Sequence, residues 1–181
     1  VDAKTIRYGL GAIKGTGESA IGAIARAREE GGDFADLFDF CRRIDKRVAT
    51  RRVIEALIRA GAFDSIDERR SSLMASVGIA LEAAEQAERD ALQVGLFDMG
   101  GAGEQRLQPI AAPPWSERER LLNEKQALGF FLSGHPYNEI RAELSAFIRK
   151  PLSALEPQKE PLLLAGIVTA TRTQMTRRGK M

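Results

Sequence analysis

The chain has 181 residues, of which 44% are hydrophobic and 29% charged, a composition that excludes a disordered or collagen-like polymer. It carries 27 Lys and Arg against 25 Asp and Glu, and this near balance excludes a histone-like basic arm and an acidic tail. A single cysteine, Cys41, excludes an internal disulfide, and no apolar run reaches the roughly 20 residues that a membrane span needs. We therefore expect a soluble intracellular protein, and since the chain starts at Val1 rather than Met, a piece of a longer one.

The first third of the sequence predicts three short helices separated by turns. The first helix is bounded by Gly17 and Gly31. Asp33 is expected to cap the second helix, and Thr50 the third, which ends at Gly61. Apolar residues of the third helix recur at the spacing of a core-facing helix, so we expect these helices to enclose a common core.

The middle of the sequence predicts two more helices and a linker. A long helix is expected from about Glu68 to Leu92. Glycines and prolines then predict a flexible connector. Ser116, with Glu119 three residues later, forms a capping box for a helix that reaches about Leu128.

The last part of the sequence changes character. A break at 134–136 precedes another helix over about 140–147. Residues 162–168 are apolar and partly β-branched, and Thr-rich alternation continues to Met181, a pattern that predicts two strands. Because two strands cannot bury a face alone, we expect a mainly α chain that ends in an incomplete β domain.

A glycine turn precedes the first helix, in the order Lys14-Gly15-Thr16-Gly17. This order does not match a nucleotide-binding P-loop, which ends in Gly-Lys-Ser/Thr. Glycines allow positive φ and close approach, and the unpaired N–H groups of a helix start favour an anion such as a DNA phosphate. From these residues alone, a phosphate site and a plain connector between helices remain equal alternatives.

A second turn, at 57–64, repeats the order of helix, glycine and apolar anchor, and the two turns together resemble a tandem helix–hairpin–helix DNA-binding domain. Seven Lys and Arg lie between residues 42 and 59, which suits a polyanion but equally a solvated helix face. The resemblance implies contacts with duplex DNA from residues of both turns and of the third helix: Lys14, Gly15, Thr16, Gly17, Arg51, Arg52 and Gly61.

Longer stretches carry a more specific resemblance. Residues 8–15 (YGLGAIKG), 51–64 and 124–136 (EKQALGFFLSGHP) resemble, in the same order, the alpha subunit of bacterial DNA polymerase III, the C-family of replicative polymerases. The resemblance implies a cytoplasmic, nucleoid-associated DNA-directed DNA polymerase as the parent protein. It places the Mg²⁺ of that enzyme outside this chain, which lacks the catalytic palm and is expected to be inactive and to need no cofactor.

The same resemblance implies four parts. Residues 1–67 correspond to the tandem helix–hairpin–helix domain, and 68–115 to a long helix, a clamp-binding motif and a linker. Residues 116–160 correspond to a helical collar, and 161–181 to the start of an OB-fold barrel.

A short motif, Gln93-Val94-Gly95-Leu96-Phe97, follows the long helix. Taken alone, it is typical of a helix end that folds two apolar residues onto the core. Within the polymerase resemblance it is similar to the motif that binds the sliding clamp, with Gln93 as hydrogen-bonding residue and Leu96 and Phe97 as buried anchors. We therefore expect duplex DNA, the sliding clamp and other replisome subunits as partners, and no membrane.

No catalytic or metal-binding cluster is evident in the sequence. His135 is the only histidine and is expected to order its turn, and Trp115 is expected to anchor the collar. Two other functions remain open: a stand-alone helix–hairpin–helix repair or recombination protein, and a helical scaffold with no DNA role.

Overall fold

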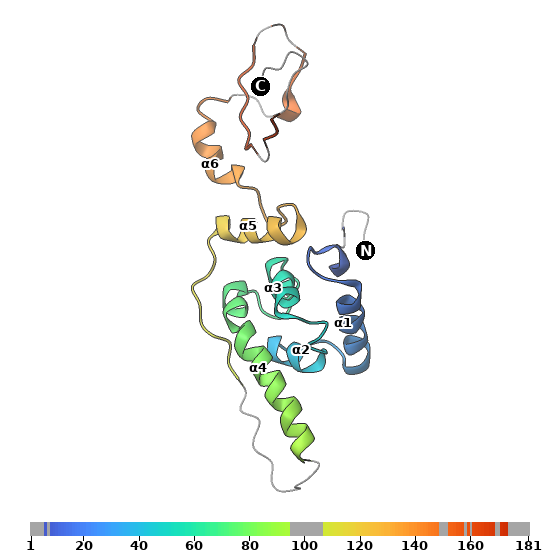
Figure 1. The fold of residues 1–181 in the computed structure, drawn as a ribbon. Helices are drawn as coiled ribbons and strands as arrows, with labels where there is room; N and C mark the ends of the chain where they lie inside the picture. The colour runs from blue at the N-terminus through green and yellow to red at the C-terminus, as the bar shows by residue number, and fades with distance from the viewer. Residues whose placement is uncertain are drawn as a thin grey trace. The chain divides into compact units, whose positions relative to one another are not determined.

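The computed structural model describes residues 6, 8–94, 107–148, 152–157, 159, 161–168 and 171–173. They fall into two compact units, Val1–Leu132 and Ser133–Met181. The first unit contains a short 3₁₀ turn, η1 (Leu10–Ala12), and helices α1 to α5 (Figure 1). The described residues are mainly helical, as the sequence predicts.

Helix α1 (Glu18–Gly31) begins and ends at the predicted glycines. Gly17 is its N-cap and Gly32 its C-cap, with φ of 73° at Gly32. Ala20 and Ile24 turn one face of α1 into the core. The helix boundary therefore follows from glycine, which lets the chain leave the helix with a positive φ.

Helix α2 (Leu37–Arg43) corrects the predicted cap. The N-cap is Asp36, whose carboxylate accepts a hydrogen bond from the Asp39 N–H at 2.7 Å, and not Asp33. Both positions carry the same residue type, so composition could not separate them. Phe40 lies in the core, with the rings of Phe34 and Phe63 each 5.0 Å away between centroids. Positions six apart do not meet on one face of a helix, so the contact between Phe34 and Phe40 requires a non-helical chain before Leu37.

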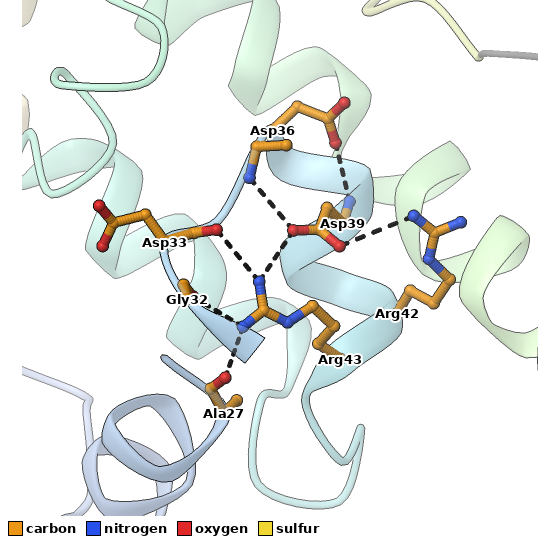
Figure 2. A network of polar contacts seen from close by, with 8 residues as sticks. Ala27, Gly32, Asp33, Asp36, Asp39, Arg42 and Arg43 are labelled. Atoms are coloured by element: carbon orange, nitrogen blue, oxygen red, sulfur yellow. Dashed lines mark hydrogen bonds and ion pairs between the residues drawn. The ribbon is translucent and has the colours of Figure 1, made fainter. Parts of the chain in front are cut away.

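Arg43 joins the end of α1 to α2 (Figure 2). Its guanidinium donates to the carbonyl oxygens of Gly32 at 2.8 Å and of Ala27, and to the Asp39 carboxylate at 3.1 Å. Burial alone would raise the pKa of Asp39, but the hydrogen bonds from the Ala35 N–H and Arg43, and the charges of Arg43 and Arg42, lower it below its ordinary value. The carboxylate is therefore held charged in the folded chain.

Helices α3 (Arg51–Arg59) and α4 (Arg70–Val94) form the centre of the first unit. Ile54, Leu57 and Ile58 of α3 are almost fully buried, as the predicted stripe requires. The first half of α4 covers them with small and aliphatic side chains, and α4 also packs against α2. Apolar burial on this scale is the main stabilising contribution to such a unit.

Helix α5 (Glu117–Leu128) confirms the predicted capping box. The Ser116 hydroxyl accepts from the Glu119 N–H at 3.2 Å, and the Glu119 carboxylate accepts from the Ser116 N–H at 2.8 Å. The helix packs against α3 and ends at Gly129. It belongs to the same compact unit as the hairpins, whereas the sequence assigned it to a separate collar.

The second unit contains α6 (Tyr137–Leu144) and a 3₁₀ turn, η2 (Leu152–Ala154). The His135 Nδ1 accepts from the Tyr137 N–H at 3.2 Å, so this histidine orders the turn before α6. Residues 161–168 and 171–173 form no strand in the structure, so the two predicted strands are not seen there. A pair of strands is marginal without others to pack on, and the described part of this unit supplies none.

Candidate nucleic-acid interface

The first hairpin is built by its backbone. The Ile13 N–H donates to the Leu10 carbonyl at 3.1 Å, and Ile13 is buried. Gly15 has φ of 90°, a value that glycine alone adopts freely. The Thr16 hydroxyl contacts the carbonyl oxygens of Ile13 and Leu10 at 2.7 and 3.0 Å, so this side chain closes the turn from within.

The hairpin leads into a helix start without a side-chain cap. Gly17 is the N-cap of α1 and offers no side-chain acceptor to the first N–H groups of the helix. The first two residues of the helix, Glu18 and Ser19, are exposed, and their N–H groups lie at the positive end of the helix dipole. The arrangement therefore offers several N–H groups to an anion arriving from solvent.

Two exposed cations flank this hairpin. A Cβ on Gly15 would lie 3.8 Å from Arg52 Nε, which places the α3 side chain beside the turn. Within the described ranges, neither Lys14 nor Arg52 has a carboxylate partner. The structure thus brings together Lys14, Gly15, Thr16, Gly17 and Arg52 out of the predicted contacts.

Arg51 is directed into an ion pair instead. Its Nε lies 2.9 Å from Glu55 Oε1, and Arg59 Nη2 lies 3.2 Å from the other oxygen of the same carboxylate. A DNA contact by Arg51 would compete with this pair, so the structure distinguishes Arg51 from its neighbour Arg52.

The second hairpin differs from the first. Gly61 has φ of 78°, but a Cβ there would lie 2.8 Å from both Arg70 Cζ and Asp64 Oδ2. The N–H groups of Gly61 and Ala62 donate to the carbonyl oxygens of Ile58 and Leu57. Gly61 is therefore required by packing, and its predicted contact with DNA stays a prediction.

Sequence reasoning missed the ion pairs beside this turn. Arg70 Nε lies 2.7 Å from Asp64 Oδ1, and its Nη1 lies 3.1 Å from Oε1 of the fully buried Glu124. The hydrogen bond to Asp64 raises the pKa of Arg70 above its already high ordinary value. The sequence does offer one sign of this buried ion pair. Glu124 lies on the face of α5 that also carries Leu121 and Leu128, where an apolar residue is expected.

The predicted clamp motif lies at the edge of the described residues. Gln93 is in the last turn of α4, where the structure describes its backbone alone, and Leu96 and Phe97 lie outside the described residues. In the described ranges no group of three or more His, Cys, Asp or Glu could hold a metal ion. No described helix is long and apolar enough to cross a membrane.

Comparisons with known proteins agree with this geometry. Residues 1–73 match the model of a helix-hairpin-helix motif family. The DNA polymerase III subunit alpha of Neisseria meningitidis serogroup A is 49% identical over 176 residues, 97% of this chain and 15% of the relative. The subunits of Vibrio cholerae and Escherichia coli K12 are 44% and 40% identical, over 98% and 96% of this chain and 16% of each relative.

The chain spans about 15% of the length of the curated relatives that it matches. Its similarity runs through both units rather than through the hairpins alone, since it covers 97% of the chain. The resemblance seen in the sequence is thereby confirmed: the chain is homologous, over nearly all of its length, to one segment of the DNA polymerase III alpha subunit.

Proposed function

We propose that this chain is the part of a replicative DNA polymerase III alpha subunit that holds duplex DNA through the first hairpin. The observation that carries the proposal is the uncapped start of α1 at Gly17, behind the positive-φ turn of Gly15. Lys14 and Arg52, which have no carboxylate partner among the described residues, stand beside this turn. The homology to polymerase subunits supports DNA as the polyanion.

The proposed contacts with DNA do not depend on the base sequence. The N–H groups at the start of α1 would donate to phosphate oxygens, and Lys14 and Arg52 would neutralise phosphates of the duplex. Such contacts fix the position of a duplex without reading its bases. Binding should therefore be indifferent to sequence and should weaken steeply as salt rises.

Titration of a fluorescent duplex with the chain, followed by anisotropy at several salt concentrations, tests this proposal. Lys14→Ala and Arg52→Ala should each make the slope of log K against log salt less steep by about 0.9, the value for one phosphate contact. Lys46→Ala is the matched control, because Lys46 carries the same charge but pairs with Glu88 at 3.0 Å.

If all three variants change the salt slope equally, the effect is one of net charge alone, and a specific site at the hairpin is refuted. Duplex binding that ignores Lys14 and Arg52 would place the contact elsewhere on the chain, and no binding to duplex at all would favour a helical scaffold. A strong preference for particular base pairs would also contradict the proposal, because backbone contacts cannot produce one.

We propose a second function, a tether to the ring-shaped sliding clamp, from the motif that follows α4. Its supports are the polymerase homology and the position of Gln93 in the last turn of a long helix. The remaining assignments follow the same homology: an OB-fold that begins near residue 161, a DNA-directed DNA polymerase as parent and Mg²⁺ held outside this chain. Nucleotide incorporation by the purified chain would contradict a catalytic Mg²⁺ site outside it.

A further inference from the structure

The carboxyl end of α5 lies against the first hairpin. The Lys14 N–H donates to the carbonyl oxygen of Ala127 at 2.7 Å. Gly129 ends the helix with φ of 92° and ψ of −5°, and its N–H donates to the Lys125 carbonyl at 2.9 Å. The backbone of Lys14 is thereby fixed by a helix more than a hundred residues further along the chain.

The side chain of Lys14 uses the space that Gly129 leaves. A Cβ at position 129 would lie 3.1 Å from Lys14 Nζ and 3.4 Å from its Cε. The distance to Nζ is tighter than an ordinary contact, so a side chain at 129 would require the ammonium group to shift by a few tenths of an ångström or more. The last carbonyl groups of α5 carry a negative partial charge, which favours a cation at this end of the helix.

An aromatic contact holds the same junction from the other side. The rings of Tyr8 and Phe130 meet edge to face, with centroids 5.3 Å apart and an angle of 74° between their planes. Tyr8 precedes the hairpin and Phe130 follows Gly129 directly, so the two segments are joined at Tyr8 as well as at Lys14.

We propose that Gly129 is a positioning residue of the DNA interface, which sets the place of the Lys14 ammonium group through the end of α5. The inference rests on the proposed function, since it concerns the phosphate that Lys14 would contact. It makes α5 the third element of the interface, beside the first hairpin and α3.

A double-mutant cycle tests the inference, with Gly129→Asn, Lys14→Ala and the variant that carries both. Asparagine tolerates the left-handed backbone of a helix end, so this change adds a side chain at the smallest conformational cost. Gly78→Asn is the matched control, because a Cβ at that α4 position meets nothing within 4 Å. Each variant is titrated with a duplex over a range of salt, and its thermal unfolding is recorded in parallel.

Lys14→Ala is expected to reduce the magnitude of the slope of log K against log salt by about 0.9. The ratio of its affinity at 0.1 M salt to its affinity at 1 M salt should therefore be about eightfold smaller than the same ratio for the unaltered chain. Gly129→Asn should lower the slope in the same direction, and the double variant should lose no more than Lys14→Ala alone. Gly78→Asn should leave the slope unchanged. A loss of stability alone would change the folded fraction but not the number of phosphates contacted.

The two failures can be told apart. If Lys14→Ala leaves the slope unchanged, the proposed function fails and the inference falls with it. If Lys14→Ala lowers the slope but Gly129→Asn does not, or if the two losses add, the proposed function stands and the inference is wrong. Should Gly129→Asn not fold, a nuclear Overhauser effect between Lys14 Hε and Gly129 Hα in the unaltered chain supports the inference, and its absence overturns it.

Discussion

Three glycines with left-handed backbones serve three different purposes in this chain. Gly15 opens the first hairpin, Gly61 leaves room for the guanidinium of Arg70, and Gly129 leaves room for the side chain of Lys14. The sequence predicts a turn at Gly15 and at Gly61, because glycine adopts positive φ without strain, and it predicts a helix end near Leu128. What each turn accommodates depends on residues distant in the sequence, which a local pattern cannot reveal.

The tight packing around Gly61 predicts a contrast between two glycine substitutions. Gly61→Ala should destabilise the chain by about 1–2 kcal/mol from backbone strain alone, with a further loss as its Cβ meets Arg70 Cζ. Gly78→Ala should stabilise it by up to about 1 kcal/mol, since alanine favours the interior of α4 and the site is open. Urea unfolding of both variants measures this, and equal effects would contradict the packing role of Gly61.

Cys41 predicts a dependence of stability on alkaline pH. Burial raises the pKa of its thiol to about 12, and the negative charge of Asp36 acts in the same direction. A group with a raised folded pKa stabilises the fold below its unfolded pKa and loses that effect as pH rises through the folded pKa. Stability should therefore fall between about pH 9 and 12, and the fall should be smaller in Cys41→Ala.

Thermal unfolding of both chains from pH 8 to 11 measures the difference, and tyrosine and lysine titrations, common to both, cancel in the comparison. Because the thiol stays neutral near pH 7, a thiol reagent should label Cys41 slowly in the folded chain and rapidly in denaturant. Rapid labelling of the folded chain would contradict this.

At the scale of elements, local patterns predicted the helices and long-range contacts decided their details. Helix α5 was predicted with its capping box because Ser116 and Glu119 act on each other across one turn. The cap of α2 was missed because the contact between Phe34 and Phe40, not the cap residue type, distinguishes Asp36 from Asp33. The glycine turn of the first hairpin and the helix start behind it were predicted, but the contribution of Glu124 was not, since its partner Arg70 is 54 residues away.

The position of Glu124 predicts its contribution to stability. Its Oε1 pairs with Arg70, its Oε2 accepts from the Leu132 N–H at 2.8 Å, and Glu124 itself is fully buried. Removing one member of a buried ion pair costs about 3–5 kcal/mol, whereas an exposed pair contributes at most about 1 kcal/mol. Glu124→Ala should thus be far more damaging than Glu88→Ala, which removes the exposed pair with Lys46.

Chemical denaturation of both variants tests this prediction. A loss below about 1 kcal/mol for Glu124→Ala would place its stabilisation in the range of an ordinary surface pair. The unfolding of α5 and of the hairpins should remain one transition in every variant, because α5 packs on α3 within one compact unit.

At the scale of the whole molecule, the proposed functions lie on different parts of the chain. The proposed contacts with duplex DNA are made by residues 14–17 and Arg52, and the proposed contact with the sliding clamp by the motif that begins at Gln93. A polymerase that must follow its template without leaving it gains from two weak attachments more than from one, because the second becomes intramolecular once the first has formed. The two sites should therefore be separable by mutation.

The separation predicts opposite effects of two variants. Leu96→Ala with Phe97→Ala should abolish binding to a sliding clamp, since a few buried anchors dominate such peptide contacts at about 2 kcal/mol or more each, and should leave duplex binding unchanged. Lys14→Ala should weaken duplex binding and leave clamp binding unchanged.

Surface plasmon resonance on immobilised clamp and anisotropy on free duplex measure the two separately. Clamp binding that survives the double substitution would move the tether to another segment, and loss of duplex binding in that variant would show that the two sites are coupled.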